Sequence, residues 1–194
     1  MTMSEPSRDI VVVVPTRERP GAVEPLVAAF ANTSTTSTGL VFAVDLDDPL
    51  RDEYRAAVRR ERLAGAPVSL GTVTPGGSMV VALNTVAHAL KSGPYAIGFM
   101  GDDHRPRTTG WDAVYLRALR ELGSGLVFGD DRVQGAKLPT HIVMTSDIVE
   151  TLGYMAPPEL QHLFVDDWWL KVGCGAGALR YLPDVTVEHL HPVA

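Results

Sequence analysis

The sequence has little of several features, and each shortage excludes a class of protein. Cys174 is the single cysteine among 194 residues, so a disulfide scaffold and a cysteine-based zinc finger are excluded. Apolar runs such as Ile10 to Val14 are too short to cross a bilayer, and residues 1–9 lack the charged start and apolar stretch of a secretory signal. These absences predict a soluble protein of the cytoplasm, or of the host cytoplasm if a phage encodes it.

Positive charge is also scarce. The chain has 17 Lys and Arg against 23 Asp and Glu, which gives a net charge of −6 and a pI of about 5.4. This balance argues against broad electrostatic capture of nucleic acid or an anionic membrane, although a locally basic groove is compatible with it. Apolar residues make up 45% and charged residues 21%, as in globular proteins. This length predicts one domain over residues 1–194, with residues 1–9 flexible.

Strand and helix patterns alternate along the whole chain. The β-branched run at residues 10–14, bounded by Pro15, is typical of a parallel strand buried on both faces. Further strands are expected at residues 40–44, 67–72, 95–100, 125–128, 141–144 and 179–190, and helices at 20–30, 50–64, 78–89, 111–122, 145–152 and 164–172. The alternation predicts a single α/β domain with a mostly parallel, Rossmann-like sheet flanked by helices.

Carboxylates gather where strands are expected to end. Three groups follow strands and a fourth stands beside two tryptophans: Asp45/Asp47/Asp48, Asp102/Asp103, Asp130/Asp131 and Asp166/Asp167. The carboxyl ends of parallel strands line one crevice, so we expect these groups to converge in space. Carboxylates repel one another unless a cation neutralises them, so an Asp-Asp pair after an apolar strand suits Mg2+ or Mn2+ bound to a diphosphate. The alternative is turn chemistry, which is strongest for Asp130/Asp131.

Other polar residues near these strand ends are candidates for ligand binding. Gly76 and Gly77 precede an expected helix, so their backbone N–H groups could receive an anion. A plain turn followed by a helix cap at Ser78 explains them equally well. The loop lacks the Gly-Lys-Ser/Thr ending of a P-loop and the spacing of a dinucleotide fingerprint. Arg17 and Arg19 follow the first strand and could balance phosphate charge through bidentate contacts.

Histidines near the end of the sequence are candidate metal ligands. Residues 185–191 alternate as in a strand, which places His189 and His191 on the same face. Imidazole is the commonest metal ligand in proteins and also carries protons near neutral pH. The alternative interpretation is that both histidines lie on a solvated edge of the sheet. His104 directly follows an acid pair and is another candidate, although there we favour the alternative of an exposed loop histidine.

In this order the motifs resemble those of a compact GT-A glycosyltransferase, close in style to the family 2 nucleotide-sugar enzymes. The segment Val13 to Pro20 is similar to the opening strand and nucleotide-binding loop of that fold, and Asp45 to Asp48 look like its second-strand acid, which contacts the nucleobase. With the glycine loop and the first acid of the next motif, the resemblance implies a nucleotide-sugar site of Pro15, Thr16, Arg17, Arg19, Asp45, Asp47, Gly76, Gly77 and Asp102.

The later motifs resemble the metal and base elements of the same family. Phe99 to Asp103 looks like the DXD-type motif, which implies that Asp103 coordinates the metal and that Asp102 approaches the ribose or the metal. The segment Phe164 to Leu170 resembles the acidic xED element, which implies Asp167 as general base, with Asp166 as the second choice. His189 or His191 would be the metal-binding histidine that this family has near the end of the domain. The bound ion would be Mn2+ or Mg2+.

The resemblance implies an enzyme that transfers a sugar from a nucleoside diphosphate, with UDP favoured, to an acceptor hydroxyl with inversion. Its partners are then a nucleotide-sugar donor and an acceptor that the sequence leaves open: a polysaccharide, a protein or a modified nucleic-acid base. The alternatives are a metal-dependent nucleotide-sugar hydrolase and a non-catalytic nucleotide-binding module. A sugar-nucleotide nucleotidyltransferase is less well supported, because its Gly-rich, basic opening loop is missing.

Overall fold

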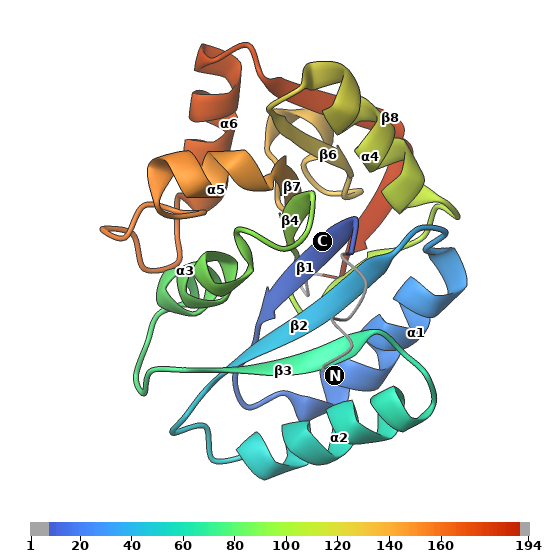
Figure 1. The fold of residues 1–194 in the computed structure, drawn as a ribbon, viewed down its shortest axis with the longest axis vertical. Helices are drawn as coiled ribbons and strands as arrows, with labels where there is room; N and C mark the ends of the chain where they lie inside the picture. Colours follow the sequence, from blue (N-terminus) through green and yellow to red (C-terminus); the bar gives the residue numbers. More distant parts are fainter. Residues whose placement is uncertain (1–7, 191–194) are drawn as a thin grey trace, which may run out of the picture.

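A central β-sheet with helices on both faces organises the chain (Figure 1). The computed structural model describes residues 8–190, so His191 and residues 1–7 of the segment expected to be flexible lie outside the described residues. The strands of this part are β1 (Ile10–Pro15), β2 (Thr38–Asp45), β3 (Val68–Val73), β4 (Ala96–Phe99), β5 (His104–Pro106), β6 (Leu126–Asp130), β7 (Ile142–Thr145) and β8 (Leu179–His189). The helices are α1 (Val23–Thr33), α2 (Arg51–Leu63), α3 (Met79–Leu90), α4 (Trp111–Leu122), α5 (Ser146–Leu152) and α6 (Val165–Gly175), with 3₁₀ turns η1 (Pro20–Ala22) and η2 (Gly135–Lys137).

The strand order within the described part is β3-β2-β1-β4-β7-β6-β8-β5. Strands β1 to β4 pair in parallel, and β6 pairs in parallel with β8, so the predicted mostly parallel α/β sheet is confirmed. Strand β7 is antiparallel to both neighbours, because residues 131–141 contain only η2 and no crossover helix that would return the chain in the same direction. Strand β5 was not predicted; it pairs antiparallel with β8.

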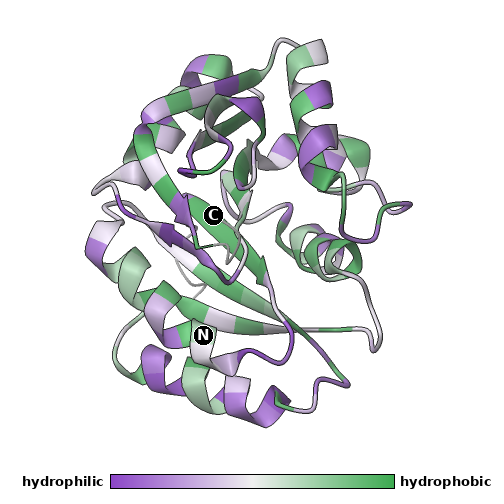
Figure 2. Ribbon diagram, turned by 180° about the vertical axis from the view of Figure 1, so that it is seen from behind, coloured by the Kyte–Doolittle hydropathy of each residue, from purple (hydrophilic) through white to green (hydrophobic). Residues whose placement is uncertain are grey.

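Alternate side chains of β1 enter two separate apolar clusters. Ile10, Val12 and Val14 pack with residues of α1, α2 and α4, whereas Val11 and Val13 pack with residues of α3, α5 and α6. The central strands are accordingly hydrophobic along most of their length in Figure 2, while the outer faces of the helices carry the polar residues. No helix in the described range has the length and apolar character needed to cross a membrane.

Some of the predicted carboxylates hold loops together. Asp131 Oδ1 accepts N–H groups from Val133, Gln134 and Gly135, and its Oδ2 accepts the Thr140 hydroxyl at 2.7 Å. The turn interpretation of the Asp130/Asp131 pair is therefore confirmed.

Asp48 acts in a similar way on the loop that follows β1. It accepts the N–H of Glu18 at 2.9 Å and that of Leu50 at 2.8 Å. These bonds secure the loop after β1 to the start of α2.

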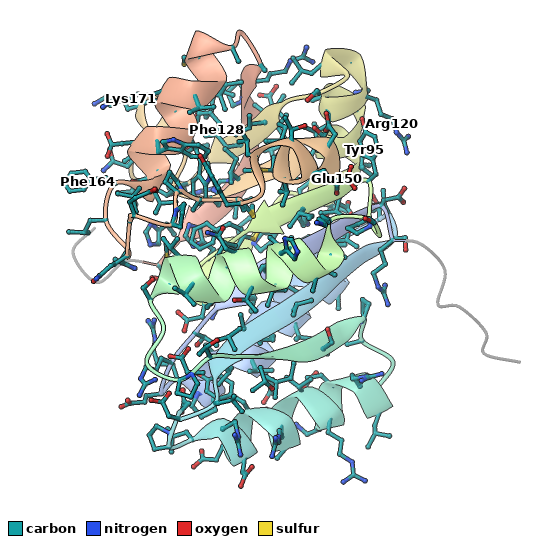
Figure 3. All side chains as sticks on the ribbon, turned by 60° about the vertical axis from the view of Figure 1, so that its left-hand side comes forward. Tyr95, Arg120, Phe128, Glu150, Phe164 and Lys171 are labelled. Carbon is teal, nitrogen blue, oxygen red and sulfur yellow. The ribbon has the colours of Figure 1, made fainter. Side chains whose placement is uncertain are left out.

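Helix α6 begins at the edge of the second apolar cluster. The Trp169 ring is buried against Phe99, with 5.2 Å between the ring centroids, and its Nε1 donates to the carbonyl of Met155. Phe164, immediately before the helix, has a φ of 70°, and its side chain points outward from the loop in Figure 3. Packing of Trp169 therefore fixes the helix, while the residues just before it face solvent.

Candidate active site

A cavity of about 540 Å³ lies beyond the carboxyl ends of β1, β2 and β4. This volume is in the range of small-molecule sites, and the position at the strand ends is where open α/β sheets bind ligands. The cavity brings together ten of the predicted site residues: Pro15, Thr16, Arg17, Arg19, Asp45, Gly77, Asp102, Asp103, Asp166 and His189. Asp47, Gly76 and Asp167 are not among its lining residues, and His191 lies outside the described part of the chain.

Arg17 organises one end of the cavity. Its Nη1 lies 2.8 Å from Asp45 Oδ2 and 3.1 Å from Asp47 Oδ1. The guanidinium, together with the backbone N–H of Gly76, holds the pKa of the Asp47 carboxyl below its usual range. Asp45 Oδ1 is buried and has no hydrogen-bond partner among the described residues. Asp45 lines the cavity, and this unused acceptor oxygen lies behind the loop of Gly77.

The glycine loop supports this end from outside. Gly76 has a φ of 64°, which favours glycine, and it donates its N–H to Asp47. A Cβ on Gly77 would lie 3.4 Å from Asp45 Oδ1, so the loop packs closely on the free oxygen. Ser78 Oγ accepts the N–H of Val81 and caps α3, as the turn interpretation expected. The Gly76 N–H is thus bound to a protein carboxylate, and Gly77 is the glycine that reaches the cavity.

Asp102 is bound by the loop after β1. Its Oδ2 accepts the Thr16 hydroxyl at 2.6 Å and lies 3.1 Å from Arg19 Nε. Burial raises the pKa of Asp102, and the bonds from Thr16 and Arg19 oppose that change. Tyr54 lies behind this group: its hydroxyl accepts the N–H of Arg19 and lies 2.8 Å from Thr16 Oγ1. Sequence reasoning missed Tyr54, because nothing marks it within an arginine-rich helix.

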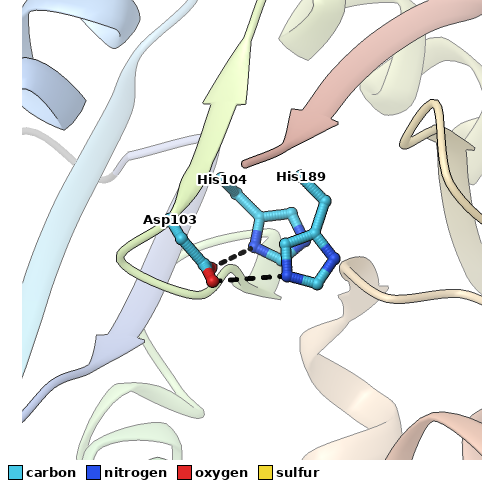
Figure 4. A group of neighbouring side chains, drawn as sticks. All are labelled: Asp103, His104 and His189. Atoms are coloured by element: carbon cyan, nitrogen blue, oxygen red, sulfur yellow. Dashed lines mark ion pairs between the residues drawn. The ribbon is translucent and has the colours of Figure 1, made fainter. Parts of the chain in front are cut away.

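Asp103, His104 and His189 form a compact cluster (Figure 4). The two oxygens of Asp103 lie 3.3 Å from His104 Nδ1 and 3.3 Å from His189 Nε2. The imidazole rings stack with 4.2 Å between centroids. Burial lowers the pKa of His104, whereas the Asp103 carboxylate raises the pKa of His189. One carboxylate oxygen and two ring nitrogens thus lie within 4.8 Å of one another.

The expectation of an exposed loop histidine at position 104 is wrong. His104 is only 2% exposed, because β5 pairs with β8 and makes His104 the direct register partner of His189. The backbone N–H of Gly101 donates to His104 Nδ1 at 3.0 Å, so that nitrogen carries no proton. That bond uses the single in-plane lone pair of Nδ1, so a cation held between Nδ1 and the Asp103 oxygen 3.3 Å away would have to displace the Gly101 N–H. The donor set fits a divalent metal ion.

Further contacts orient the cluster. Thr140 Oγ1, which donates to Asp131, lies 3.5 Å from His104 Nε2. The carbonyl of Asp131 accepts the N–H of His189, and the carbonyl of Asp103 accepts that of Leu190. Such outer contacts fix the orientation of ligand side chains in metal sites. The turn-forming carboxylate Asp131 thus supports the cluster indirectly.

Two carboxylates stand in the first turn of α6. Asp166 lines the cavity, and its Oδ1 accepts the N–H of Asp167 at 3.0 Å. The neighbouring residues His162, Leu163 and Phe164 also line the cavity. The first turn of α6 thus faces the cavity with a carboxylate.

Comparison of the fold with known structures gives clear likenesses. A mannosyltransferase from Pyrobaculum calidifontis, solved with GDP-Man and Mn2+, aligns with 97% of this chain at a TM-score of 0.75 and 18% identity. TarS 1–349 from S. aureus, solved with UDP, aligns with 92% at a TM-score of 0.69 and 14% identity. The chain spans 58% and 59% of those two chains, and 36% of a longer TarS chain.

Sequence comparisons add no closer relative. No protein-family model matches the chain, and no curated protein matches its sequence significantly. The structural likenesses alone therefore show that the chain has the α/β fold of nucleotide-sugar glycosyltransferases, as the resemblance of its motifs implied.

Proposed function

We propose that this protein is a metal-dependent glycosyltransferase that moves a sugar from a nucleoside diphosphate, UDP in the first instance, to an acceptor hydroxyl. The observation that carries the proposal is the content of one cavity. It is lined by Asp45, which carries an unused acceptor oxygen, by an Asp-His-His cluster and by the carboxylate of Asp166. The nucleotide complexes of similarly folded proteins, with UDP, UDP-GlcNAc and GDP-Man, support this assignment.

In this proposal the donor nucleotide occupies the end of the cavity near Arg17. Asp45 Oδ1 accepts an N–H of the nucleobase after a small shift of the Gly77 loop uncovers it, which satisfies an oxygen that is otherwise buried without a partner. Asp102, fixed by Thr16 and Arg19, stands beside the ribose. Uracil and guanine both present ring N–H groups, so Asp45 alone is compatible with UDP-sugars and GDP-sugars.

The metal ligands are proposed to be Asp103, His104 and His189. Two imidazole nitrogens beside one carboxylate favour Mn2+ over Mg2+, which prefers oxygen ligands. When bound there, such an ion supplies Lewis acidity toward the leaving diphosphate. Thr140, next to the other ring nitrogen, holds His104 in place for this role.

The general base is proposed to come from the carboxylate pair at the start of α6. The base takes the proton of the acceptor hydroxyl, and the acceptor oxygen forms a bond to the anomeric carbon of the donor sugar. At the same time the bond between that carbon and the phosphate oxygen breaks, and the nucleoside diphosphate leaves. Attack from the face opposite the leaving group inverts the configuration. The family motif favours Asp167, whereas the cavity wall carries Asp166.

Calorimetric titration with UDP-GlcNAc and GDP-mannose, with and without Mn2+, tests donor binding. We expect Mn2+ to tighten binding of at least one donor in the wild type but not in Asp103→Ala. Asp52→Ala, on an exposed carboxylate of α2, is the matched control and should behave as the wild type. Equal donor binding with and without metal in the wild type would contradict the proposal.

Asp166→Asn and Asp167→Asn, measured side by side, identify the base. Loss of general-base catalysis is expected to slow transfer by about 10²–10⁴-fold in one variant, with donor affinity unchanged. Normal transfer in both variants would refute a base at α6. Sugar release without any acceptor would indicate the hydrolase alternative, and donor binding without turnover would indicate a binding module.

A further inference from the structure

Phe164 adopts a backbone conformation that aromatic residues rarely take. Within residues 8–190, three non-glycine residues have a positive φ: Glu18, Arg132 and Phe164. The N–H groups of Glu18 and Arg132 are bound by the carboxylates of Asp48 and Asp130, which accounts for their turns. Phe164 lies at the N-cap of α6 without a side-chain cap bond. Strained residues of this kind concentrate at functional sites, which points to a role for the Phe164 ring.

The Phe164 side chain stands at the rim of the cavity. It is 65% exposed and the neighbouring Leu163 is 68% exposed, and both line the cavity with His162. Figure 3 shows the Phe164 side chain standing away from the body of the protein. The loop is tied at both sides, because the carbonyl of Gln161 accepts the N–H of Val80 and that of Phe164 accepts the N–H of Trp168. The two apolar side chains are therefore presented to solvent by an anchored backbone, two and three residues before Asp166.

We propose that Leu163 and Phe164 form the acceptor subsite of the proposed glycosyltransferase, and that they bind a neutral carbohydrate stacked on the Phe164 ring. This inference rests on the proposed function, because the reaction needs an acceptor hydroxyl beside the α6 carboxylates. An aromatic ring next to that point suits the apolar face of a sugar.

The charge around this rim selects among acceptors. Glu159, Asp166 and Asp167 are close in sequence to the two apolar side chains, and Asp166 lines the same cavity. Arg17 and Arg19 of the same cavity are already paired with Asp45, Asp47 and Asp102, so the charge left at the α6 end is negative and disfavours a polyanion such as nucleic acid. The subsite therefore favours a neutral sugar over a phosphate-rich polymer.

The test is sugar binding to the protein saturated with UDP and Mn2+. Methyl and p-nitrophenyl glycosides of glucose, galactose, mannose and N-acetylglucosamine serve as probes, and binding is followed by saturation-transfer difference NMR. At least one probe is expected to bind the wild type and Phe164→Tyr. Phe164→Ala and Phe164→Gly are expected to bind it about two- to tenfold more weakly, the range that one aromatic contact supplies.

Two controls separate recognition from folding. Leu63→Ala removes a leucine on α2 that is 80% exposed and lies away from the cavity, and it should leave sugar binding unchanged. Phe164→Gly relieves the positive φ, so its melting temperature should equal or exceed that of the wild type while its sugar binding falls. UDP affinity should be the same in all variants.

Three results would overturn the inference and leave the proposed function standing: equal sugar binding by Phe164→Ala, no binding of any probe by UDP-saturated wild type, or Phe164-dependent binding of an oligonucleotide in place of the sugars. Failure of the wild type to bind UDP in the presence of Mn2+, with no other nucleotide donor bound, would overturn the proposed function and this inference with it.

Discussion

Replacement of Asp112 by alanine is expected to lower the free energy of unfolding by about 3–5 kcal/mol. The Asp112 carboxylate is fully buried in α4 and accepts the backbone N–H groups of Thr35 and Thr36. It also accepts hydroxyl groups from Thr35, Thr36 and Thr38. One side chain thus holds the whole threonine-rich segment that leads into β2.

The magnitude follows from the groups that lose their acceptor. The backbone N–H groups of Thr35 and Thr36 are part-buried, and loss of their charged acceptor costs about 1–3 kcal/mol each, to which the lost bonds from the threonine hydroxyls add. For a domain of this size, each kcal/mol lowers the melting temperature by about 2–4 °C, so the expected fall is roughly 6–20 °C. Urea unfolding followed by circular dichroism measures the change, and Asp52→Ala should shift stability by less than about 0.5 kcal/mol.

The pH dependence provides a second readout. Burial raises the pKa of Asp112, but the bonds from Thr35, Thr36 and Thr38 outweigh it, so the folded-state pKa lies below the unfolded value. The stabilisation is then present above about pH 4 and is lost as the pH falls through the folded-state pKa. The difference in the free energy of unfolding between wild type and Asp112→Asn should therefore become smaller only below about pH 4. A loss below about 1 kcal/mol for Asp112→Ala would refute the reasoning, because water would then replace the carboxylate.

Three further changes test the supports of the site. Tyr54→Phe leaves the N–H of Arg19 without its acceptor, so it should lower the free energy of unfolding in urea by about 1–3 kcal/mol and weaken UDP binding in calorimetry. Unchanged values would show that Tyr54 does not support the site. Gly76→Ala places a Cβ at a positive φ and should lower the free energy of unfolding by about 1–2 kcal/mol. Gly21→Ala, where φ is not positive and the space is also open, should lower it by less, and equal losses would contradict the strain argument. Thr140→Val removes the hydroxyl beside His104 and should weaken Mn2+ binding about 10-fold or more in a metal titration. Thr140→Ser keeps the hydroxyl and serves as the conservative control. Unchanged affinity in Thr140→Val would show that the hydroxyl does not orient the ring.

The strands and helices were predictable because their patterns are local. The buried run at Ile10 to Val14 reads as a parallel strand from its composition alone, and acids after such strands are expected to meet at one edge of the sheet. The cavity confirms that convergence for Asp45, Asp102 and Asp103.

The features that were missed depend on pairing between distant segments. His104 becomes buried only because β5 pairs with β8, and three residues of a short strand carry no periodic signal. Strand β7 runs antiparallel because of its connection, which composition does not reveal. Tyr54 contacts the site through the fold of α2 against the loop after β1. Each case needs three-dimensional register in addition to local pattern.

The pairing of β5 with β8 also affects when the site can form during synthesis. Asp103 and His104 leave the ribosome long before His189, which belongs to the last strand described. Until that strand docks, β5 lacks its hydrogen-bonding partner and the cluster lacks one of its two imidazoles. A nascent chain therefore cannot present the three-ligand cluster, and any ion retained by all three ligands reports that β8 has been made and has joined the sheet.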